Sequence, residues 1–86
     1  MNKEQRSVVV EYVSTLSEDE LRLLTQRLTD RLQDDIPEAL NMLSQSARID
    51  QILVTAGSAW ELFDFCDKIR EVCTKECKRR GVPLKM

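Results

Sequence analysis

Leucine recurs at intervals of three and four residues in the second quarter of the chain. The set is Leu21, Leu24, Leu28 and Leu32. Such spacing places the leucines on one face of a helix with 3.6 residues per turn. The segment Ser17-Glu18-Asp19-Glu20 precedes them and has the pattern of a capping box, in which the serine and glutamate side chains each accept a backbone N–H. The sequence therefore predicts an amphipathic helix over residues 18–33.

The longest helix is expected near the end of the chain, over residues 59–80. Ser58-Ala59-Trp60-Glu61 is a second capping-box pattern at its start. Gly81 is a natural C-terminal cap, and Pro83 follows two residues later, as is common after helices. Shorter helices are expected over three further ranges: 3–16, 37–46 and 50–56.

Two of the shorter segments also have features of strands. The run Val8-Val9-Val10 is β-branched, but the apolar residues around it fall on one helix face, so we expect a helix. The run Ile52-Leu53-Val54-Thr55 fits a short helix capped by Asp50 or a buried strand, because periodicity does not separate the two in so short a run. We expect the helix, since few other segments could serve as partner strands.

The composition is that of a folded helical domain. Of the 86 residues, 42% are hydrophobic and 33% are charged, while glycine and proline together number four. These values disfavour both a disordered chain and a turn-rich β architecture. We therefore expect one domain, residues 1–86, with an all-α fold: a small compact bundle of four to six helices with a long C-terminal helix.

The core of this bundle is expected to contain the leucine stripe and the cluster from Trp60 to Phe65, and Trp60 could instead be an exposed interface anchor. The length, with several short helices before one long helix, resembles the architecture of the death-fold class of homotypic adaptor modules. No motif in the sequence identifies that family.

The side chains that many enzymes need are missing. The chain has no histidine, which excludes Ser-His and Cys-His catalysis and histidine metal ligands. Its two glycines cannot form a GxGxxG loop or a P-loop. We therefore expect no enzyme activity, no cofactor and no small-molecule substrate. No apolar run approaches the roughly 20 residues of a membrane span, and the N-terminus is polar, so we expect no membrane contact and a cytoplasmic location.

Three cysteines lie on one face of the last expected helix, because Cys66, Cys73 and Cys77 are seven and four residues apart. Free cysteine is among the most buried residue types, and a metal site usually has four ligands where this chain offers three thiols. We expect three core residues and no metal site, with Cys77 the most accessible because it is nearest the helix end. A metal-binding or redox protein is the alternative.

Charge is unevenly distributed along the chain. Residues 75–86 contain five bases and one acid, a charge of +4, whereas residues 1–74 contain eight bases and fourteen acids, a charge of −6. A basic end can contact phosphate, and a small nucleic-acid-associated regulator is therefore an alternative function. We do not expect it, because no aromatic residue lies among these bases and the acidic body would repel a duplex.

An acidic body with a basic end favours oriented contact between proteins. We expect a protein-interaction or adaptor module that binds a protein partner or a second copy of itself, with a few apolar anchors supplying affinity. The candidate residues lie at the start of the second helix, at the corner before the third and at the end of the last. They are Glu18, Asp19, Glu20, Asp34, Asp35, Lys78, Arg79 and Arg80.

Overall fold

The computed structural model describes residues 1–29 and 35–83. Within these ranges the chain forms five α-helices and no strand, so the expected all-α fold with a long C-terminal helix is confirmed. The helices are α1 (Lys3–Thr15), α2 (Glu18–Thr29), α3 (Asp35–Ser44), α4 (Ala47–Leu53) and α5 (Ala59–Arg80). The helical interpretation of both ambiguous segments is also confirmed. The last part of the expected helix 18–33, residues 30–33, lies outside the described residues.

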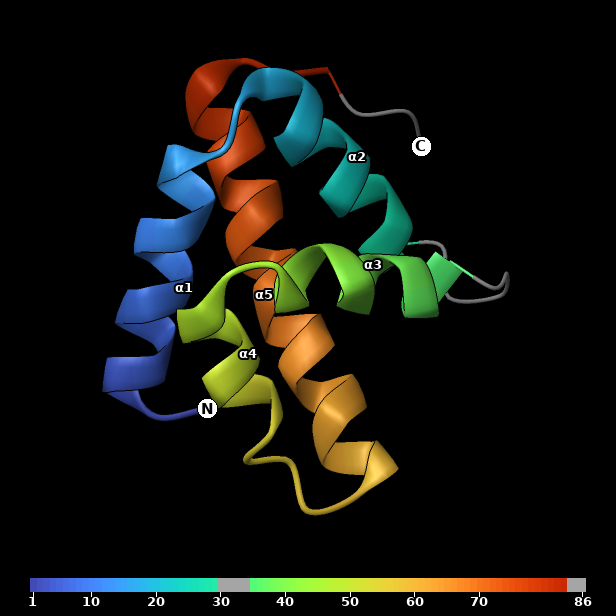
Figure 1. The fold of residues 1–86 in the computed structure, drawn as a ribbon. Helices are drawn as coiled ribbons and strands as arrows, with labels where there is room; N and C mark the ends of the chain where they lie inside the picture. Colours follow the sequence, from blue (N-terminus) through green and yellow to red (C-terminus); the bar gives the residue numbers. More distant parts are fainter. Residues whose placement is uncertain (30–34, 84–86) are drawn as a thin grey trace.

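Helix α5 is the element against which the others are arranged. Its 22 residues span about 33 Å at 1.5 Å per residue, close to the longest dimension of the molecule, 35 Å. In Figure 1, α1 runs beside α5 in the same direction, α2 returns across it, and α3 and α4 lead back to its start. The C-terminal ends of α1 and α5 and the start of α2 therefore lie together at one end of the molecule.

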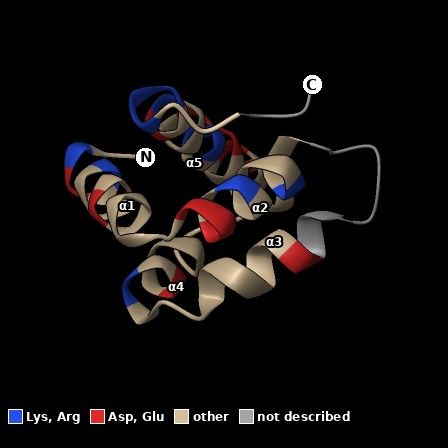
Figure 2. Cartoon of the chain, turned by 90° about the horizontal axis from the view of Figure 1, so that it is seen from above, with Lys and Arg blue, Asp and Glu red and all other residues tan. Residues whose placement is uncertain are grey.

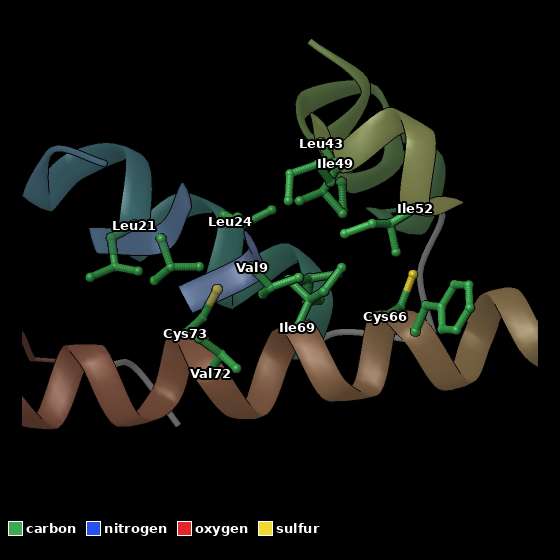
Figure 3. Packing of buried hydrophobic residues seen from close by; sticks show 14 of the residues in the cluster. Val9, Leu21, Leu24, Leu43, Ile49, Ile52, Cys66, Ile69, Val72 and Cys73 are labelled. Carbon is green, nitrogen blue, oxygen red and sulfur yellow. The ribbon is translucent and has the colours of Figure 1, made fainter. Parts of the chain in front are cut away.

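The hydrophobic core lies between α5 and the other helices, whose side chains point toward it in Figure 3. The expected leucine stripe of α2 is buried at Leu21, Leu24 and Leu28. Burying a leucine side chain stabilises the fold by roughly 1.5–3 kcal/mol. The prediction for the aromatic cluster was only partly right, because Phe65 is buried but Trp60 lies on the surface.

The capping box at the start of α2 is confirmed. The Oγ atom of Ser17 accepts the Glu20 N–H at 3.2 Å, and the Glu20 carboxylate accepts the Ser17 N–H at 3.0 Å. The second expected box forms only in part. Ser58 Oγ accepts the Glu61 N–H at 3.3 Å, but the Glu61 carboxylate accepts the N–H of Gly57, at 2.8 Å, one residue before the predicted donor.

The starts of α3 and α4 differ from the sequence prediction, because α3 begins at Asp35 where residue 37 was expected and α4 begins at Ala47 where residue 50 was expected. Helix α4 begins after Ser46, whose side chain accepts the Ile49 N–H at 3.5 Å, so Asp50 lies within the helix and does not cap it. Helix α3 accordingly ends at Ser44. Helix α1 has a capping box that was not predicted, in which Asn2 and Gln5 exchange hydrogen bonds of 2.8 and 3.1 Å.

The end of α5 forms as expected. Gly81 has a φ of +73°, a left-handed conformation that favours glycine, and the Val82 N–H donates to the Cys77 carbonyl at 2.9 Å.

None of the helices in residues 1–29 and 35–83 combines the length and the apolar character that crossing a membrane requires.

Candidate functional site

The expected acidic and basic surfaces lie at the same end of the molecule, which Figure 2 views from above. Glu18, Asp19 and Glu20 are exposed on the first turn of α2. The bases of the last turn of α5 lie beside the α1–α2 connection, because the Arg80 guanidinium donates to the Leu16 carbonyl at 2.7 Å. The fold thus brings together two of the three predicted groups of site residues.

Two of the three acids have partners in α2 or in the residue that precedes it. Asp19 forms an ion pair with Arg22 at 2.9 Å. The pKa of Glu20 is lowered, first by the hydrogen bond from the Ser17 backbone N–H and then by the Ser17 hydroxyl. Glu18 forms no ion pair with any described residue and remains available to a partner. All three also lie at the positive end of the helix dipole, which stabilises them without a partner.

Arg80 has a structural role that the sequence did not reveal. Its guanidinium donates to the carbonyls of Leu16, Ser14 and Val13 at 2.7, 2.9 and 3.3 Å. The last carbonyls of a helix have few partners within the helix, and of these three the Val13 carbonyl also accepts the Leu16 N–H at 3.2 Å. Arg80 therefore caps the C-terminus of α1 from 64 residues away. Arg80 also lies 3.7 Å from the Glu76 carboxylate.

The other bases of the last turn are more accessible. Arg79 is paired with Glu76 on the same helix, and this pairing lowers the pKa of the Glu76 carboxyl and raises that of Arg79. Lys78 is exposed and has no ion pair with a described residue. Of the three predicted basic site residues, Lys78 and Arg79 are therefore on the surface, whereas Arg80 is largely committed to α1.

The predicted corner before α3 is not described to the same extent. Asp34 and the side chain of Asp35 lie outside the described residues. Glu38, one turn further along α3, forms an ion pair of 3.1 Å with Arg27 of α2.

The three cysteines are buried, as expected for core residues, and none of them forms a disulfide. The prediction that Cys77 is the most accessible was wrong. Cys77 is fully buried because its side chain faces α2, where the Thr25 hydroxyl lies 3.7 Å from its sulfur. Burial raises the pKa of the Cys73 thiol to about 12. The described residues contain no group of three or more Cys, Asp or Glu side chains arranged to hold a metal ion.

Two aromatic side chains are exposed at the start of α5. Trp60 is 84% exposed and Phe63 is 47% exposed, and their spacing of three residues places them side by side on the helix surface. We call this pair the aromatic patch. The carboxylates of Glu61 and Asp64 are exposed next to it, and neither forms an ion pair with a described residue.

A hollow of about 240 Å³ lies between α1 and the second half of α5. We call it the basic groove; it is lined by Arg6, Val10, Val13, Val72, Lys75, Glu76 and Arg79. Sequence reasoning missed this groove, because its two sides come from segments about 60 residues apart. It also missed a local signal for the exposure of Trp60, which is that a charged residue, Asp64, follows it at four residues on the same face of the helix.

The fold and these surfaces define a small helical bundle with one aromatic, acidic end and one groove rimmed by bases. Comparisons with protein-family models, with curated proteins and with solved structures gave no match.

Proposed function

We propose that this chain is a protein-interaction module, of the adaptor kind, in which the aromatic patch supplies affinity and the charged helix surfaces orient the partner. The observation that carries the proposal is the exposure of Trp60 beside Phe63. Tryptophan is enriched among the residues that dominate the binding energy of interfaces, and large exposed apolar side chains that lie together mark interaction sites.

The charged surfaces support oriented contact. Lys78 and Glu18 are exposed without ion-pair partners among the described residues, on neighbouring helix ends. These charges lie at the opposite end of α5 from the aromatic patch, so they support the proposal through the field that steers and orients an approaching partner, while the apolar anchors provide most of the affinity.

No observation favours the nucleic-acid alternative over this proposal. Arg79 is paired with Glu76, and Arg80 donates to backbone carbonyls of α1, so two of the bases that would contact phosphate already have partners within the chain. Nor does any observation favour metal or redox chemistry, because the three thiols are buried.

A photo-crosslinking phenylalanine analogue at position 63 tests the proposed function in living cells. Leu23 offers a matched control, because it is also an apolar side chain of similar exposure, 42%, but lies on α2. We expect discrete protein adducts from position 63 and none from position 23.

The mass of the adduct identifies the kind of partner. A mass of twice the chain shows self-association, and any other discrete mass shows a different protein. Absence of adducts from position 63, or equal labelling from both positions, would contradict the proposed function.

A further inference from the structure

We propose that the aromatic patch of one copy docks in the basic groove of a second copy, so that the chain assembles head to tail. This inference rests on the proposed function and names its partner, a second copy of the same chain, together with the two surfaces that meet.

The groove has the size and the lining that an aromatic side chain requires. Its floor is apolar, since Val13 and Val72 are buried and the side chain of Val10 is 48% exposed at one wall. An apolar cavity of about 150 Å³ in a protein accommodates a benzene ring, so a hollow of about 240 Å³ has room for an indole. Covering Val10 and Trp60 with each other would remove two of the exposed apolar side chains from water.

The charges around the two surfaces are complementary. Arg6 and Lys75 at the rim of the groove are exposed and form no ion pair with a described residue, and Arg79 is balanced by Glu76. The groove therefore presents a net charge of about +2. The aromatic patch is flanked by the exposed carboxylates of Glu61 and Asp64, neither of which forms an ion pair with a residue in 1–29 or 35–83.

The two surfaces cannot meet within one molecule. Twelve residues, about 18 Å of helix, separate Trp60 from Val72, and the two side chains lie about 120° apart around α5. A contact between different surfaces of identical molecules is heterologous, and it generates a ring or an open filament rather than a closed pair. Each added copy leaves one free patch and one free groove.

Two variants, each lacking one surface, test this arrangement. Trp60→Ser removes the patch and changes a side chain that is mostly in water, whereas Val10→Glu places a negative charge in the groove and repels the acidic flanks of the patch. We expect the wild-type chain to grow in mass with concentration beyond a dimer in light scattering. Each variant alone should self-associate with an affinity at least about 30-fold lower than that of the wild type, as expected for the loss of a dominant interface residue.

Mixing the variants should restore one contact only. The patch of Val10→Glu is intact and fits the intact groove of Trp60→Ser, so the mixture should form a 1:1 complex of twice 10.0 kDa and stop there. Trp60 is the only tryptophan, so tryptophan fluorescence in this mixture, excited selectively over that of Tyr12, comes from Val10→Glu alone. Its emission should shift to shorter wavelength as Trp60 enters the partner's groove.

A mixture that shows neither the complex nor the emission shift would overturn the head-to-tail arrangement. If wild type still associates, or if position 63 crosslinks to a different protein, the proposed function stands and only this inference fails. Circular dichroism confirms that both variants are folded. Lys75→Glu, on an exposed rim residue, serves as a second groove variant and should behave as Val10→Glu does.

Discussion

Arg80 is the residue whose role differs most from what its position suggests. A base in the last turn of a helix ordinarily complements the negative end of that helix's own dipole. Here the guanidinium reaches instead to three carbonyls at the end of α1. These contacts use both terminal nitrogens of Arg80. Replacing Arg80 with an acidic residue would therefore remove the cap of α1 and lower the stability of the fold, in addition to any effect on partner binding.

Replacing Arg80 with alanine is expected to destabilise the fold by about 2–3 kcal/mol, because hydrogen bonds to charged groups contribute about 1.5–3 kcal/mol and the α1 carbonyls lose their partner. Urea unfolding followed by circular dichroism measures the change. Arg79→Ala is the matched control, since its guanidinium is mostly exposed and pairs only on the helix surface. Equal losses for the two variants would contradict a capping role for Arg80.

Cys73 makes the stability of the fold depend on pH in the alkaline range. Burial raises its pKa from 9.0 to about 12. Above pH 9 the unfolded chain loses the thiol proton while the folded chain keeps it, so this contribution is complete below pH 9 and declines as pH rises toward 12. We expect the unfolding free energy to fall by about 1 kcal/mol between pH 9 and pH 10.

Urea unfolding at a series of pH values measures this slope. Cys73→Ala, although less stable overall, should lose that part of the pH dependence. A slope that is unchanged in Cys73→Ala would assign it to other groups.

At the scale of the elements, helix starts are set by local hydrogen bonds that the sequence largely reveals. Ser17-Glu18-Asp19-Glu20 predicted both the start of α2 and its reciprocal hydrogen bonds. Asn2 and Gln5 have the same spacing of three residues, so the signal for the start of α1 was present and was overlooked. The backbone N–H that donates to the Glu61 carboxylate could not be predicted, because Gly57 and Ser58 both offer an N–H group within its reach.

Replacing Ser17 with alanine should cost about 1 kcal/mol, the usual contribution of an N-cap side chain. The loss leaves the Glu20 N–H without its side-chain acceptor. Thermal unfolding monitored by circular dichroism measures the effect. Ser7→Ala, an exposed serine inside α1, is the control and should be neutral or slightly stabilising, because alanine has the higher helix propensity. A neutral Ser17→Ala would contradict the role of the capping box.

At the scale of the whole molecule, the number and type of helices could be predicted, but not the surfaces they form together. The spacing of Leu21, Leu24 and Leu28 indicates which face of α2 is buried without indicating which helix covers it. The basic groove exists only because α1 runs beside α5, and nothing local to Val10 or Lys75 indicates that they share a hollow. Contacts between distant segments therefore form the basic groove, whereas both residues of the aromatic patch lie on α5.

The contact between Arg80 and Leu16 also has a consequence for the order in which the chain matures. The Leu16 carbonyl is synthesised first, and its guanidinium partner is added 64 residues later. At about 5–20 residues per second, the ribosome needs roughly 3–13 seconds to cover that distance. Throughout that interval α1 lacks this capping contact, so the end of α1 becomes fully capped only after α5 has been synthesised.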